Sequence, residues 1–260
     1  MPQFEREGAR VHYEMRGSGT PLLLIAGTAS DGASWSPLLP LLEPRFQLIL
    51  IDNRGSGRTR SEGDITLMRM AADAAALLEH LGIARADVVG HSLGGHLGLL
   101  LAVEHPARVR RLITLGSGTM TAASRMLFRD MARLYFTAAP EDWFRLLYQW
   151  LFSERFFADE AGVAAAAAAS ASYAYRQSPA DFARQVAAIE RGARVDFRRV
   201  RCPVLAVAAE RDLLAPPEAV AALHREVPDL RHLRIAEAAH SVHWEQPEAV
   251  AEAMIRFLEA

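Results

Sequence analysis

The motif Gly-x-Ser-x-Gly at residues 90–94 is the strongest chemical signal in the chain. It lies between a short apolar run that is typical of a strand and a longer segment that is typical of a helix. In that context Ser92 occupies a tight, strained turn with its hydroxyl exposed at the start of the helix, and the glycines let neighbouring backbone pass close by. We therefore predict that Ser92 is a nucleophile. The alternative is a glycine-rich turn that only packs a helix on a sheet.

A serine hydroxyl is a weak nucleophile at neutral pH and needs a base within hydrogen-bond reach. His240 lies in a loop between a predicted strand and the last predicted helix, and is the candidate base. His243 is its main rival, whereas His91 is expected to pack beneath the turn that carries Ser92. A metal site of His240, His243 and Glu245 does not match known zinc spacings, so we predict no metal and no cofactor.

The imidazole of a catalytic histidine needs an acid that fixes its tautomer and orientation. Asp212 follows the predicted strand 204–210, and the carboxyl ends of parallel strands are where reactive groups gather. Asp52 also follows a strand, but we expect it to fix the turn 52–57, with Arg54 as the nearest candidate partner.

An ester carbonyl that is attacked by serine becomes an oxyanion, which needs preorganised N–H donors. We predict that the backbone N–H of Leu93, directly after the nucleophile, is one of them. The second is expected from the loop after the strand at 21–26, at the backbone N–H of Thr28. The hydroxyl of Thr28 is a hypothetical third donor.

The composition excludes several other functions. The chain has 260 residues and no lysine, so Schiff-base enzymes, Ser-Lys dyads and Walker-type phosphate loops are excluded. The net charge of −2, without a basic or acidic block, gives no indication of a nucleic-acid or membrane partner.

The single cysteine, Cys202, is expected to be a small buried residue. The first residues do not resemble a signal peptide and no apolar run is long enough to span a bilayer, so we expect a cytoplasmic protein.

Short apolar runs alternate with helix-like segments along most of the chain, which predicts an α/β fold with a mostly parallel sheet and helices on both faces. From about residue 121 to 200 the strand-like runs disappear and the sequence is helical and rich in aromatic residues. We predict a core domain of residues 1–120 and 201–260, and a helical cap of residues 121–200. The expected strands are 11–16, 21–26, 46–52, 87–90, 111–115, 204–210 and 231–236, and the expected helices outside the cap are 66–81, 93–104, 216–227 and 247–259.

Taken together, these motifs resemble the α/β-hydrolase superfamily, whose triad has the chain order that Ser92, Asp212 and His240 have here. The last third, with Cys202-Pro203-Val204 and Glu245-Gln246-Pro247-Glu248, is similar to the enol-lactonase-like group that acts on 3-oxoadipate enol-lactone, and to cofactor-free haloperoxidase-like esterases. The resemblance implies hydrolysis of a carboxylic ester or lactone and a helical cap over the site. Many relatives have His-Gly where this chain has Ala26-Gly27, but the backbone donor at Thr28 survives that change.

We therefore expect a serine hydrolase for a small, largely apolar ester or lactone, with Trp143 and Trp150 of the cap as candidate substrate contacts. Three alternatives remain open. The same triad serves lyases, cyclases and C–C bond hydrolases, and the same fold can bind a ligand with slow turnover or none. An aminopeptidase would need cap carboxylates for the substrate ammonium, and no spacing of acidic residues distinguishes such a set.

Overall fold

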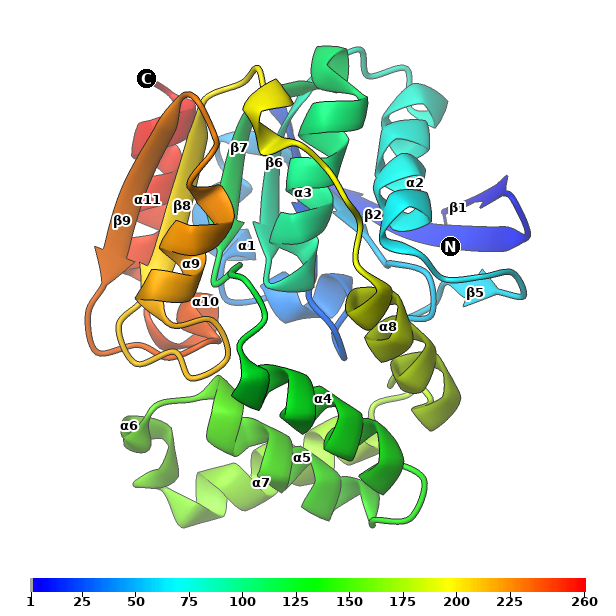
Figure 1. Ribbon diagram of the computed structural model, residues 1–260, viewed down its shortest axis with the longest axis vertical. Helices are drawn as coiled ribbons and strands as arrows, with labels where there is room; N and C mark the ends of the chain where they lie inside the picture. The colour runs from blue at the N-terminus through cyan, green and yellow to red at the C-terminus, as the bar shows by residue number, and fades with distance from the viewer. Residues whose placement is uncertain (1) are drawn as a thin grey trace.

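A nine-stranded sheet forms the centre of the protein, whose computed structural model describes residues 2–260 (Figure 1). The strand order is β1-β2-β4-β3-β6-β7-β8-β9, and β5 pairs with β2. The six strands from β4 to β9 in that order are parallel, while β2 is antiparallel to its neighbours β1, β4 and β5. The strands are β1 Gln3–Arg6, β2 Ala9–Arg16, β3 Thr20–Ile25, β4 Phe46–Ile51, β5 Arg60–Ser61, β6 Ala86–His91, β7 Val109–Leu115, β8 Val204–Ala209 and β9 Leu230–Ile235.

Helices cover both faces of the sheet, because side chains alternate between the two faces along each buried strand. In β8, for example, Val204 and Ala206 point to the face that carries α2, α3 and α9, whereas Leu205 and Val207 point to the face that carries α1 and α11 (Figure 1). The helices and 3-10 turns of the core are η1 Gly32–Trp35, α1 Leu39–Leu42, α2 Leu67–His80, α3 Leu93–Glu104, η2 Pro106–Arg108, α9 Pro217–His224, α10 Val242–Glu245 and α11 Pro247–Leu258.

A separate group of helices lies between β7 and β8 in the sequence and beside the carboxyl ends of the parallel strands (Figure 1). It has an apolar centre of its own, in which Trp143, Phe144 and Phe182 are buried. We call this group, residues 121–200, the helical insertion. Its helices are α4 Ala122–Leu134, α5 Pro140–Leu151, α6 Glu154–Phe157, α7 Glu160–Ser172 and α8 Pro179–Arg191, and the 3-10 turn η3 Phe197–Arg199 lies at its end.

The expected parallel sheet, its two helical layers and the helical run at 121–200 are all present. Helix α2 begins after Thr66, whose hydroxyl accepts a hydrogen bond from the Arg69 N–H, and Gly82 follows its end with a φ of 67°. The short elements β1, β5, α1 and α10 were not expected. Helix α9 ends at His224, three residues before the end that the sequence pattern predicts.

No helix among residues 2–260 is long and apolar enough to cross a membrane. The candidate catalytic residues lie at the carboxyl ends of the parallel strands, and a cavity that Ser92 and His240 line lies between the core and the helical insertion.

Candidate active site

Ser92 lies on a sharp turn between β6 and α3, with φ 52° and ψ −116°. A non-glycine residue with positive φ is strained, and such strain is typical of a functional turn. The turn is possible only because of its glycines. A Cβ atom on Gly94 would lie 1.9 Å from the carbonyl oxygen of Ile25, and one on Gly90 would lie 2.2 Å from the backbone of Gly94. The predicted strand–turn–helix context of the motif is therefore present.

The structure brings Asp212 and His240 together. Nδ1 of His240 donates to Oδ2 of Asp212 at 2.8 Å, and both residues are buried. The other carboxylate oxygen of Asp212 accepts from the N–H groups of Leu214 and Ala215, each at 2.8 Å. These bonds hold the carboxylate rigidly and leave Nε2 of His240 as the free ring nitrogen. Ser92 and His240 line the same two cavities.

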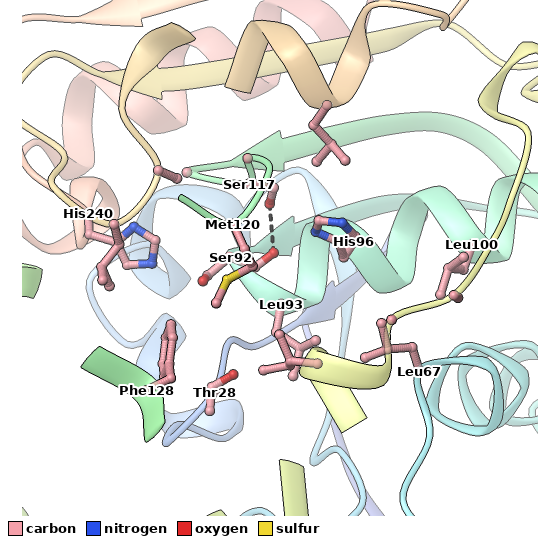
Figure 2. Close-up of a pocket in the computed structure, with 18 of the residues that line it drawn as sticks. Thr28, Leu67, Ser92, Leu93, His96, Leu100, Ser117, Met120, Phe128 and His240 are labelled. Carbon is pink, nitrogen blue, oxygen red and sulfur yellow. Dashed lines mark hydrogen bonds between the residues drawn. The ribbon is translucent and has the colours of Figure 1, made fainter. Parts of the chain in front are cut away.

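Thr28 and Leu93, the candidate oxyanion donors, line a cavity together with Ser92 (Figure 2). Leu93 is the first residue of α3, so its N–H has no acceptor within the helix. The loop that carries Thr28 is fixed by Asn53, whose Nδ2 donates to the carbonyl of Ala26 at 2.9 Å. Ala29 has a φ of 60°, a second strained residue directly after Thr28.

The loop that carries His240 is tied to the rest of the site by His91 and Glu245, for which the sequence predicted no such contact. Nε2 of His91 donates to the carbonyl of His240 at 2.9 Å, so the turn beside Ser92 also holds the backbone of the histidine. The Glu245 carboxylate accepts from the Ala239 N–H at 2.6 Å and from the N–H of Ser153 at 2.9 Å. Since Ser153 belongs to the helical insertion, Glu245 links the insertion to the histidine loop.

His243, the rival base, is buried and packs against other rings. Its centroid lies 5.2 Å from that of Trp35 and 4.5 Å from that of His91. Burial, with a smaller contribution from His240, lowers the pKa of His243 to about 3. The hydrogen bond to Asp212 is made by His240 alone of the two, which favours His240 as the base.

Two cavities open at Ser92. The inner cavity, of about 260 Å³, runs along α3 and is shown in Figure 2. The cap cavity, of about 660 Å³, lies between the core and the helical insertion. Aromatic side chains of the insertion form much of the wall of the cap cavity: Phe128, Phe144, Tyr148, Phe152, Phe156 and Phe182.

The structure places the two candidate substrate-binding tryptophans differently from the sequence-based expectation. Trp143 is fully buried inside the helical insertion, where its Nε1 donates to the carbonyl of Met131 at 2.9 Å and its ring stacks on Tyr135 at 3.8 Å. Neither Trp143 nor Trp150 lines the inner cavity or the cap cavity. Phe144 and Tyr148, on the same helix, line the cap cavity instead.

Asp52 fixes its turn, but without Arg54. Its carboxylate accepts from the N–H groups of Gly32 and Arg58, each at 2.9 Å. Arg54 pairs instead with the buried Asp73 on α2, with Nε–Oδ2 at 2.6 Å and Nη2–Oδ1 at 2.9 Å. The expected Asp52–Arg54 pair was therefore wrong.

The part of the chain from 2 to 260 contains no group of three or more histidine, cysteine, aspartate or glutamate side chains arranged to hold a metal ion. Cys202 is buried, and burial raises the pKa of its thiol to about 11. A thiol in that state is a poor nucleophile.

Comparison with known proteins defines the class. Residues 20–247 match the family model described as alpha/beta hydrolase fold, and the chain belongs to this family.

Among its relatives is the protein of Azorhizobium caulinodans named "Putative carbamate hydrolase RutD", 30% identical over 259 residues, which are 99% of this chain and 98% of that protein. The solved structure of a protein of Mycobacterium tuberculosis H37Rv, described as "Putative non-heme bromoperoxidase BpoC", is 29% identical with a TM-score of 0.85 and covers 96% of this chain and 95% of that one. The enol-lactonase of Burkholderia xenovorans LB400 has the same fold, with a TM-score of 0.88, 22% identity and full coverage of both chains, at 100% each. The expected resemblance to lactonase-like and haloperoxidase-like members of the family is thus confirmed.

Proposed function

We propose that this α/β hydrolase is a serine esterase or lactonase in which Ser92 is the nucleophile, His240 the general base and Asp212 the acid that orients it. The hydrogen bond of 2.8 Å between His240 and Asp212, beside a serine held on a strained turn, is the observation that carries the proposal. This constellation is recognised by geometry and roles, and it activates an otherwise weak hydroxyl nucleophile.

The proposed reaction is acyl transfer in two steps. Nε2 of His240 takes the proton of the Ser92 hydroxyl as its oxygen attacks the ester carbonyl, and the N–H groups of Thr28 and Leu93 stabilise the oxyanion. His240 then gives the proton to the departing alcohol, which leaves an acyl-enzyme. A water molecule, deprotonated by His240, then attacks the acyl-enzyme; the acid is released and His240 returns the proton to the oxygen of Ser92. Asp212 stabilises the transient imidazolium and fixes the tautomer with the proton on Nδ1.

The cavities favour a substrate with a sizeable apolar group. The cap cavity has about 660 Å³ and an aromatic wall that includes Phe144, Phe152 and Phe156. Apolar walls bind apolar groups by removing their surface from water, at roughly 25 cal/mol per Å². We therefore propose that esters or lactones with such a group are preferred over small carbamates, the substrate class in the name of one relative.

Steady-state hydrolysis of p-nitrophenyl esters with increasing acyl length, with a small aryl carbamate in parallel, tests the proposal. We expect turnover to rise with acyl length up to a limit, and to fall by at least roughly a thousandfold in Ser92→Ala. Ser172→Ala, which changes an exposed serine in the helical insertion, is the matched control and should behave as wild type. Ester turnover that is unchanged in Ser92→Ala would show that the proposed nucleophile is wrong, and faster turnover of the carbamate would show that the substrate class is wrong.

A further inference from the structure

The inner cavity follows one face of α3. Ser92 precedes the helix, His96 lies one turn further and Leu100 another turn beyond it, so their spacing of four places the three side chains along one line. All three line the cavity, and Figure 2 shows the ring of His96 between Ser92 and Leu100. A substrate bound at Ser92 and extending into this cavity therefore passes the imidazole.

The rest of the wall beyond Ser92 is mostly apolar. Helix α8, η3, the ends of α2 and α9 and the segments beside them contribute only hydrocarbon and aromatic side chains there, namely Leu67, Ile189, Ala193, Phe197 and Leu223. His96 is the polar side chain of that deeper part of the wall. His96 is only partly buried and its ring lines the cavity, so a group that enters the cavity can reach it.

Two buried histidines, His224 and His91, have hydrogen-bond partners for their rings, whereas the buried His243 has none at either ring nitrogen in the part of the chain that the structure describes. His224 contacts the hydroxyl of Thr114 at 2.9 Å and the carbonyl of Val220 at 2.8 Å, and His91 donates to the carbonyl of His240. No hydrogen bond to the ring of His96 is found from any residue of 2–260, and its ring faces the cavity (Figure 2).

Burial, with a smaller contribution from His224, lowers the pKa of His96 to about 4. The ring is therefore neutral at pH 7 and offers one N–H donor and one nitrogen acceptor. A neutral ring in an apolar wall provides no countercharge for an ionic group, whose burial would be costly. It suits an uncharged oxygen group, either a hydroxyl or a ketone.

We infer that the part of the substrate that enters the inner cavity carries an uncharged oxygen group, which hydrogen-bonds to His96, and that His96 determines specificity for it. The inference rests on the proposed function, because it places the reacting carbonyl at Ser92. A substrate analogue without the oxygen group would bury the ring of His96 without a hydrogen-bond partner. The site should therefore disfavour such an analogue.

Two series of esters matched in length test the inference. In one, p-nitrophenyl esters carry a methylene, a ketone or a hydroxyl at successive positions of the acyl chain; in the other, acetate esters carry the same changes in the alcohol. We expect the kcat/KM of wild type for the ester with a ketone or hydroxyl to exceed that for the matching methylene ester by roughly 5- to 150-fold, at one or more positions in one of the two series.

His96→Leu should reduce this preference to about one, while His96→Gln, which keeps a donor and an acceptor, should restore much of it. Leu223→Val changes the same wall without changing its polarity, and it is the matched control that should keep the preference. Circular dichroism and turnover of the plain esters show that each variant is folded.

A wild-type preference near one throughout both series, or a preference that is the same in His96→Leu, would overturn the inference and leave the proposed function intact. If wild type hydrolyses none of the esters and Ser92 does not react with a phosphonate, the proposed function fails and the inference fails with it.

Discussion

Replacement of His243 by leucine should make the protein more resistant to acid. In the folded protein the pKa of His243 is lowered to about 3, first by burial and then by the nearby His240, whereas its ordinary value is 6.5. Below pH 6.5 the unfolded chain therefore binds a proton at this position that the folded protein does not bind. Folding stability must then fall as the pH falls from about 6.5 towards 3.

The size of the effect follows from the two pKa values. One pH unit between them corresponds to about 1.4 kcal/mol, so His243 should remove about 2 kcal/mol of the free energy of unfolding between pH 8 and pH 5. Leucine has no titrating group and a similar volume, and it keeps the apolar contact with the ring of Trp35. The His243→Leu variant should lose about 2 kcal/mol less than wild type over the same range.

Urea denaturation of wild type and His243→Leu at pH 8 and pH 5 measures this difference directly, because losses due to other buried histidines occur in both proteins and cancel. His232→Leu, which removes an exposed imidazole from β9, is the matched control. An equal loss of stability in wild type and His243→Leu would contradict this prediction, since it would mean that His243 is protonated in the folded protein as easily as in the unfolded chain.

Three further substitutions test contacts between distant segments of the chain. Glu245→Gln removes the negative charge that accepts hydrogen bonds from Ala239 and Ser153, so we expect kcat to fall roughly tenfold with little change in KM. Ser153→Ala removes only the hydroxyl bond to Glu245 and keeps the backbone bond, so its effect on kcat should be smaller. Steady-state kinetics in which both variants match wild type would contradict this prediction. Asp73→Ala leaves the guanidinium of Arg54 buried without its carboxylate, which should cost about 3–5 kcal/mol of unfolding free energy in urea denaturation; a loss below about 1 kcal/mol would show that the pair contributes little.

The parts of the fold that the sequence predicts well are those set by local patterns. Continuous apolar runs such as Val204–Ala209 identify buried parallel strands, because such strands are covered on both faces. The glycines at 90 and 94 identify the turn at Ser92, because any side chain there would collide with backbone. The positions of Asp212 and His240 after successive strands predict that they meet, since the carboxyl ends of neighbouring parallel strands share one edge.

The parts that the sequence did not predict depend on packing between distant segments. Trp143 and Phe144 are adjacent on one amphipathic helix, and only the positions of the neighbouring helices decide that the first is enclosed and the second faces the cap cavity. Arg54 finds its partner on another element, at Asp73, although Asp52 is closer in sequence. The link from Glu245 to Ser153 spans 92 positions, so no local pattern could indicate it.

The most direct test of the central claim is intact-protein mass spectrometry after incubation with a fluorophosphonate, followed by peptide mapping of the adduct. We expect one adduct on wild type at Ser92, none on Ser92→Ala, greatly slowed labelling of His240→Ala and continued labelling of His243→Leu. Labelling that persists in Ser92→Ala, or that is lost in His243→Leu but retained in His240→Ala, would contradict it.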